Sequence, residues 1–174
     1  MANTDFNVGA GVKAPRKLLK HYVNVGTKEA KDWELIGIGV EDSAIETNFE
    51  EEEVLDIYQN FSSSVTGAKP TQSFDPFTVR GGSKLAFILH EIWLNKEYEK
   101  LSQFEMLTVY SYAGDTSKGY DATIEEDCTI TFSSIGGSAY IDMPITVKYS
   151  DKKQRGTVTF GEGKAPEFVS ASAA

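Results

Sequence analysis

One segment with helical periodicity stands among segments patterned as strands, and this limits the folds open to the chain. After Ser83, apolar residues recur at helical spacing in one stripe, which comprises Leu85, Ile88, Leu89, Ile92 and Trp93. Ser83 is a suitable N-cap, and the preceding Gly81-Gly82 pair lets the backbone turn sharply into a helix over 83–95. Since no second helix is predicted to receive the stripe, we expect these side chains to pack on a sheet.

Alternation of side chains predicts most of the other segments to be β-strands. In 45–50 the apolar or Thr positions alternate with polar ones, and in 104–112 both alternating sets contain apolar residues, as in a central strand covered on both faces. In 122–132 one face is expected to carry Ala122, Ile124, Cys128, Ile130 and Phe132, and the other Thr123, Glu125, Asp127, Thr129 and Thr131. We expect a long strand or two short ones over 33–49, and a further strand over 139–149 that Pro144 places at an edge or a bulge.

These segments predict a mainly β protein with one α-helix, an α+β arrangement. About eight to ten strands would form a β-sandwich or partial barrel with the helix packed at its side. A length of 174 residues fits a single domain over 1–174. Small and polar residues predict a flexible N-terminal arm over 1–15 and a C-terminal tail over 161–174.

The charge and the apolar runs exclude two classes of protein. The formal net charge of −9, with a pI near 4.7, should repel nucleic acid rather than bind it through phosphate contacts. The longest apolar run is only a few residues, so we expect no insertion of the chain into a membrane.

No residue pattern in the sequence predicts catalysis. His90-Glu91 begins like a helical zinc motif, but Leu94 occupies the place of the second histidine. The glycine-rich segment 80–84 lacks the spacing of a phosphate-binding loop. We therefore expect no catalytic residues, no cofactor, no metal and no enzyme activity.

Two blocks of sequence resemble a known family. The run QSFDPFTVRGGSKL at 72–85, preceded by WELIGIGVEDSAIE at 33–46, is similar to major tail (tail tube) proteins of long-tailed phages and phage-like particles, most of all those from Gram-positive hosts. The resemblance extends over 23–147 with the order of segments kept. It implies a virion structural protein with two packed sheets, one of which joins the sheets of neighbouring subunits around a lumen.

The resemblance also implies an assembly and its partners. The chain would be made in the host bacterial cytoplasm and would self-assemble into stacked hexameric rings. These rings would form the tail tube of the virion and conduct double-stranded DNA to the host without specific binding. A tape-measure protein, a tail terminator and an assembly chaperone are the partners that the resemblance implies. The arm, the 59–69 loop and the tail are candidate contacts between rings.

The segments on either side of residues 59–64 predict a hairpin with an acidic face, and the acidic cluster on it has two interpretations. Glu46, Glu50, Glu51, Glu52 and Glu53 lie within eight residues. They either form a solvated edge that blocks aggregation or line the lumen of a tube, where repulsion would prevent DNA from being trapped. The candidate lumen-lining residues are Glu46, Glu50 and Glu52, together with Glu125 and Asp127 on the 122–132 strand.

Other functions remain open at the level of sequence. Related tubes include the inner tube of a phage-derived bacteriocin or of a secretion-like particle, which move other cargo or none. A monomeric β-sandwich module that binds carbohydrate or a receptor is a different class. It requires exposed aromatic residues gathered at one end of a sheet, and the candidates are Tyr110, Tyr112, Tyr120 and Tyr140.

Overall fold

A long strand, β8 (Gly119–Phe132), is shared by two branches of one nine-stranded sheet in the computed structural model, which describes residues 6–161 and 165–171. One edge of β8 pairs with β7 (Phe104–Asp115). The other edge pairs first with β10 (Lys153–Phe160) and then with β9 (Ile145–Lys148). The remaining strands are β1 (Leu19–Asn24), β2 (Trp33–Ile36), β3 (Ile45–Glu46), β4 (Phe49–Leu55), β5 (Phe61–Ala68), β6 (Thr71–Phe74) and β11 (Pro166–Ser170).

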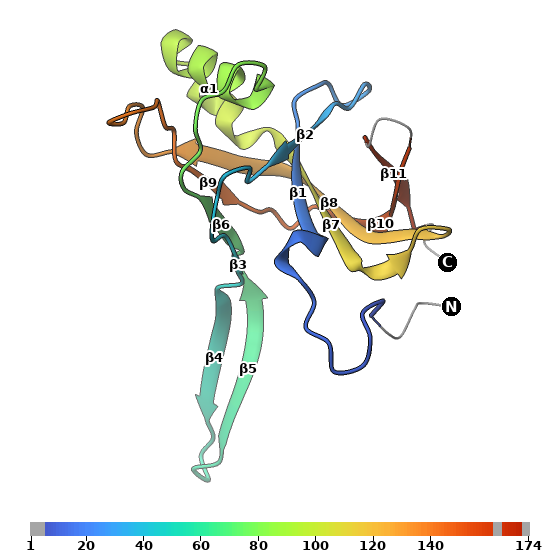
Figure 1. Cartoon of the computed structure of the whole chain (residues 1–174). Helices are drawn as coiled ribbons and strands as arrows, with labels where there is room; N and C mark the ends of the chain where they lie inside the picture. Colours follow the sequence, from blue (N-terminus) through green and yellow to red (C-terminus); the bar gives the residue numbers. More distant parts are fainter. Residues whose placement is uncertain (1–5, 162–164, 172–174) are drawn as a thin grey trace.

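The sheet curls into a half-barrel, and one pair of strands stands apart from it (Figure 1). The strand order is β2-β1-β7-β8-β9-β6-β3, with β10 and β11 forming the second branch from β8. Strands β4 and β5 make a separate two-stranded sheet that projects from the body as a long hairpin. The predicted mainly β fold with one α-helix and a partial barrel is therefore confirmed.

The strand predictions differ from the structure between residues 33 and 50. Positive φ angles at Gly37 and Gly39 end β2 early, so no long strand follows Trp33. Asn48 is also left-handed, with φ of 45°, and it separates β3 from β4. The even alternation predicted across 45–50 is therefore wrong, because the backbone turns between the two strands. The segment 139–149 contributes only β9, which begins directly after Pro144.

Helix α1 (Lys84–Asn95) begins where the N-cap signal predicts. The hydroxyl oxygen of Ser83 accepts a hydrogen bond from the backbone N–H of Ala86 and the hydroxyl donates to Glu34 of β2. The second carboxylate oxygen of Glu34 accepts from the backbone N–H of Leu85 at 2.8 Å. A carboxylate from the sheet thus satisfies free N–H groups at the start of the helix and favours this end electrostatically.

The predicted stripe of α1 lies at the edge of the half-barrel. Leu85, Leu89 and Ile92 are buried in the main core, and Ile88 is half-buried against it. Trp93 is 50% exposed and packs edge-on against Phe132, with ring centroids 6.1 Å apart. The helix ends at Lys96, which adopts the left-handed conformation, and a 3-10 helix, η2 (Tyr98–Ser102), follows it.

Two apolar clusters cover opposite faces of the central strands. Cluster one combines β1, β7, β8, β6 and β9 with α1, and includes Val23, Phe74, Leu89, Met106, Ile130 and Val147. Cluster two contains Tyr22, Leu107, Val109, Ala122, Ile124 and Val158, with β10 and β11 beside them. Adjacent residues of β1 and of β7 belong to different clusters, as the alternation of a strand requires. The prediction that 104–112 is covered on both faces is confirmed.

A bulge in β8 corrects the prediction that 122–132 has one continuous apolar face. Between β7 and β8, Met106 lies opposite Glu125, while Phe104 lies opposite Cys128. Strand β8 therefore contains one more residue than β7 over this stretch, which is a β-bulge, and Asp127 adopts a φ of 53° within it. As a result Ala122 and Ile124 belong to cluster two, whereas Cys128 and Ile130 belong to cluster one.

The structure describes part of the predicted N-terminal arm and part of the predicted C-terminal tail. Near the N-terminus, Phe6 forms a bridge with Ala113, and the backbone N–H of Asn7 donates to the carbonyl of Tyr112 at 2.9 Å. The short 3-10 helix η1 (Arg16–Leu18) then leads into β1. In the predicted tail, β11 pairs with β10. Residues 1–5 of the arm and 162–164 and 172–174 of the tail lie outside the described residues.

Candidate functional site

The β4–β5 hairpin is the most exposed regular element that the structure describes. Every residue of β4 is exposed, and so are the first six residues of β5. The segment predicted as a 59–69 loop is thus mostly strand β5, and its partner is β4. Both strands have a free outer edge, because no further strand within residues 6–161 and 165–171 pairs with this two-stranded sheet. A two-stranded hairpin of this kind has little stability alone in water and presents unpaired backbone groups.

Side-chain hydrogen bonds fix the tip of the hairpin. One carboxylate oxygen of Asp56 accepts from the backbone N–H groups of Tyr58 and Asn60, both at 2.8 Å. Its other oxygen accepts from the amide of Asn60 at 3.0 Å. These hydrogen bonds to the ionised form hold the pKa of Asp56 below its ordinary value. The ordered turn presents Ile57 and Tyr58 to solvent, with 89% and 79% of each residue exposed.

Cross-strand register divides the hairpin into two different faces. The first, called here face A, is apolar and acidic: it comprises Phe49, Glu51, Glu53 and Leu55 of β4 with Phe61, Ser63, Val65 and Ala68 of β5. The second, face B, is mostly polar and comprises Glu50, Glu52 and Val54 with Ser62, Ser64 and Gly67. The consecutive glutamates are therefore split between the faces, and they do not form one acidic surface.

Three of the predicted lumen-lining residues lie on or near the hairpin. Glu46 is exposed on β3, at the root of the hairpin. Glu50 and Glu52 share face B, and Glu50 forms an ion pair with Lys69. The structure therefore brings Glu50 and Glu52 together, while Glu46 belongs to the curled sheet.

The other two predicted lumen-lining residues are paired with lysines on the body. Glu125 is 6% exposed, and its carboxylate lies 3.3 Å from the amine of Lys153. Burial raises the pKa of Glu125, although the nearby Lys153 opposes this. Asp127 accepts from Lys152, and the amine of Lys28 is 3.9 Å away. These carboxylates are thus compensated within one chain, unlike Glu52.

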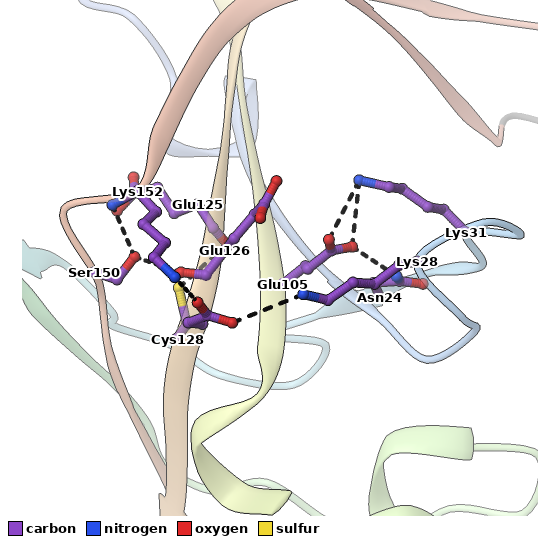
Figure 2. Close-up of polar contacts among 10 residues, drawn as sticks. Asn24, Lys28, Lys31, Glu105, Glu125, Glu126, Cys128, Ser150 and Lys152 are labelled. Carbon is purple, nitrogen blue, oxygen red and sulfur yellow. Dashed lines mark hydrogen bonds and ion pairs between the residues drawn. The ribbon is translucent and has the colours of Figure 1, made fainter.

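A buried carboxylate that the sequence analysis did not identify lies on the neighbouring strand. Glu105 of β7 is 4% exposed. It accepts a 2.8 Å hydrogen bond from the amide of Asn24, and the amine of Lys31 is 3.3 Å away. Figure 2 shows Lys31 and Asn24 approaching Glu105 from the same side. The three groups satisfy one another, which is the requirement for a charge to remain buried.

A second polar cluster joins the strands inside the half-barrel. His21 is 2% exposed, and its Nε2 accepts from the amide of Gln72 at 3.1 Å. Tyr149 donates to Gln72 at 2.6 Å, and Thr108 lies 3.4 Å from Nδ1 of His21. Burial, helped by the positive charge of Arg16, lowers the pKa of His21 to about 4. The imidazole is therefore neutral at pH 7 and ties β1 to β6 and β7.

The described residues offer little material for catalysis. They contain no group of three or more His, Cys, Asp and Glu side chains placed to hold a metal ion. Cys128 is buried, and burial raises the pKa of its thiol to about 12, so the thiolate is scarce at neutral pH. No helix in the described part is long and apolar enough to cross a membrane.

In the comparisons with known proteins, the chain is similar to solved structures. No family model matches the chain. No curated protein matches it either. Among solved structures, the chain is similar to the anti-feeding prophage cap, a tube terminating cap, with 14% identity, a TM-score of 0.49, and coverage of 90% of this chain and 99% of that one.

Two further solved structures come from an extracellular contractile injection system. A chain of its sheath–tube complex in the extended state is 12% identical, with a TM-score of 0.49 and coverage of 85% of this chain and 94% of that one. A chain of its sheath/tube terminator is 12% identical, with a TM-score of 0.47 and coverage of 84% and 99%. Likeness at this level does not establish a family or a function for the chain.

Proposed function

We propose that the chain is a structural protein that self-assembles into stacked hexameric rings, which form the tail tube of a long-tailed phage or a related particle. The observation that carries the proposal is the β4–β5 hairpin, an ordered arm with apolar side chains and two unpaired strand edges in water. The sequence resemblance at 33–46 and 72–85 supplies the kind of assembly and its six-fold ring. In the virion tail, the rings would conduct DNA to the host.

The physical argument is that the hairpin requires a partner surface. Leu55 and Phe61 lie opposite each other and are 66% and 64% exposed, and Ile57 and Tyr58 extend the apolar surface to the tip. Exposed apolar residues that are concentrated on one projecting element are typical of an interaction site. Contact with another copy would remove them from water and close the free strand edges.

The acidic residues fit a channel through which DNA passes. We place Glu46, Glu50 and Glu52 at the lumen, since they are exposed and lie near or on face B. A wall of like charge repels phosphate groups and offers no site where DNA would be retained. Glu125 and Asp127 would contribute less, because Lys153 and Lys152 compensate them.

The test is negative-stain electron microscopy of the purified protein after concentration, with light scattering on the same samples. We expect hollow rings or tubes. A paired variant, Ile57→Ser with Tyr58→Ser, removes the apolar tip, and we expect it to lower the scattering mass to that of the monomer. If the unaltered chain remains monomeric at every salt and protein concentration, the tube proposal is overturned.

A binding module for carbohydrate or a receptor is the main alternative, and the positions of the tyrosines disfavour it. Tyr110 and Tyr112 contact each other edge-on with centroids 6.0 Å apart, and both are half-buried. Tyr120 packs with Phe160 in cluster two, on the opposite face of the sheet from Tyr110. These side chains do not build one exposed platform. Glycan-array binding by a persistently monomeric protein would favour the module.

Two aspects of the proposal rest on the resemblance. An inner tube of a phage-derived bacteriocin or secretion-like particle would use the same rings for other cargo. A tape-measure protein, a tail terminator and an assembly chaperone are the proposed partners, and the proposed host is Gram-positive. Pull-down from infected or induced host cells would identify which of these proteins accompanies the tube.

A further inference from the structure

Opposite charges are segregated into two segments of the chain. Residues 6–28 contain no Asp or Glu, and their basic residues are Lys13, Arg16, Lys17, Lys20 and Lys28. Residues 41–68 contain no Lys or Arg, and their acidic residues are Glu41, Asp42, Glu46, Glu50, Glu51, Glu52, Glu53 and Asp56. The chain has a net charge of −9, so a segment of this length without acidic residues is unusual in it.

The two segments do not neutralise each other within one copy. Among the described ion pairs, none involves Lys13, Arg16 or Lys17, and none involves Glu51 or Glu53. The guanidinium of Arg16 donates instead to the backbone carbonyls of Leu19 at 2.6 Å and Ser43 at 2.9 Å. These bonds fix its position and leave its positive charge uncompensated.

Apolar residues accompany the charges on both surfaces. A groove beside Arg16 and Lys17 is lined by Leu19, Leu35 and Val40, and Leu35 is 40% exposed. Glu41 is the acidic residue among those that line it. Face A of the hairpin has the matching composition: its two adjacent glutamates are surrounded by Phe49, Leu55, Phe61 and Val65, which are 61% to 66% exposed.

We propose that face A of the hairpin docks into the groove beside Arg16 and Lys17 of a second copy of the chain. The inference rests on the proposed self-assembly and names the surface that receives the hairpin. Glu51 and Glu53 would approach the basic segment, and the apolar residues on either side of them would cover Leu19 and Leu35. Face B, with Glu50 and Glu52, would stay exposed to solvent.

The hairpin and the groove are separate surfaces of each copy, so their contact can build a closed ring. In Figure 1 the hairpin and the N-terminal segment extend from the same end of the body, with the hairpin on the left and the segment on the right. The contact is heterologous when the hairpin and the groove of one copy are used with two different neighbours, and reciprocal exchange between two copies would give a two-fold dimer instead. Each copy would offer its hairpin to one neighbour and its groove to the other, which is how a ring is formed.

The test uses complementary charge reversal. One variant reverses the hairpin, Glu51→Lys with Glu53→Lys, and the other reverses the basic segment, Lys13→Glu with Lys17→Glu. Each variant alone would oppose like charges, and we expect the concentration needed for assembly to rise at least about tenfold. A control with the same charge change as the second variant is Lys118→Glu with Lys148→Glu, two exposed lysines outside both surfaces. Circular dichroism melting checks that every variant is folded.

Mixing the two reversed variants gives the decisive result. In an equimolar mixture each reversed hairpin meets a reversed segment, and each natural hairpin meets a natural segment, so alternating rings form if the surfaces pair directly. Restored assembly supports the inference, because an unfolded variant could not restore it. The docking inference is overturned if the single variants assemble like the unaltered chain, or if their mixture fails to assemble. In both cases the proposal that the chain forms a tube is unaffected. If the unaltered chain never assembles, both proposals fall.

Discussion

Strand β7 buries every side chain from Phe104 to Val109, whereas strand β4 exposes every one of its residues. Strand β7 belongs to the body of the molecule, and strand β4 belongs to the projecting hairpin. The body gathers its apolar residues into two clusters on opposite faces of one curled sheet. The hairpin displays comparable residues, such as Leu55 and Phe61, to solvent. The body therefore supplies its own hydrophobic stabilisation, and the hairpin does not.

This difference separates stability from assembly. Changes in the body should alter the free energy of unfolding of the monomer, because buried apolar area dominates that quantity. Changes at the hairpin should leave it nearly unaltered and act on association. Variants in the body and in the hairpin therefore distinguish the free energy of unfolding from the tendency to associate.

Insertion of one alanine after Cys128 should be the most disruptive single change. The added residue turns over the part of β8 that follows it, so that Ile130 leaves cluster one and Thr129 takes its place. We expect a loss on the order of 5 kcal/mol or more, which removes most of a typical folding free energy. Thermal melting by circular dichroism should show no cooperative transition. Insertion of one glycine after Gln59 at the hairpin tip is the matched control and should melt like the parent.

Leu89→Ala should destabilise the body by about 2–5 kcal/mol, since Leu89 is fully buried and the change leaves a cavity. Leu94→Ala lies in the same helix but at a residue that is 59% exposed, and it should cost less than about 0.5 kcal/mol. Urea unfolding measures both values. Equal effects at the two positions would contradict the burial of the predicted stripe.

The stability of the body should fall on acidification below pH 6.5 because of His21. The pKa of His21 is about 4 in the folded protein and 6.5 as its ordinary value, so between these pH values the unfolded chain binds a proton that the folded chain excludes. The loss between pH 7 and pH 4 is about 3 kcal/mol at most. The variant His21→Gln should lack this loss of stability. Urea unfolding of the parent and of the variant at each pH gives two curves, and their difference separates the contribution of His21 from that of the carboxylates. If the free energy of unfolding of the parent and of His21→Gln changes with pH in the same way, His21 does not cause the loss.

The hairpin variant Ile57→Ser with Tyr58→Ser should have the smallest effect on the monomer. Both residues are largely exposed, so the free energy of unfolding should change by less than about 0.5 kcal/mol. Assembly, followed by light scattering, should nevertheless be lost. A variant that loses stability and assembly together would show that the two regions are not separable in this way.

Much of the body follows from local sequence patterns. The N-cap at Ser83 and the spacing of Leu85, Leu89 and Ile92 predict α1, because capping and helical period are set by neighbouring residues. The double apolar pattern of 104–112 likewise predicts that β7 is central. These features depend on residues only a few positions apart.

The features that sequence patterns miss depend on long-range pairing or on a single backbone angle. The bulge at Asp127 arises from the register with β7, and in the sequence its one sign is Glu126, which interrupts the apolar face predicted for 122–132. A hairpin is predicted in this region, but its bounds are not, because Asn48 turns the chain abruptly and because β5 is rich in serine. The burial of Glu105 depends on Asn24 and Lys31, which are distant in sequence. The acidic run is visible in the sequence, but its division between two faces requires the cross-strand register.

Strand β8, which both branches of the sheet share, has a consequence for the folding of the chain. Since β8 contributes Ile124 to one apolar cluster and Ile130 to the other, neither cluster can form completely until this strand is in place. Its partners β7, β9 and β10 come from both sides of it in the sequence. The two clusters should therefore open together as one cooperative unit, and slow amide hydrogen exchange should be concentrated in β7 and β8. The hairpin, outside that unit, should exchange fastest until a neighbour protects it.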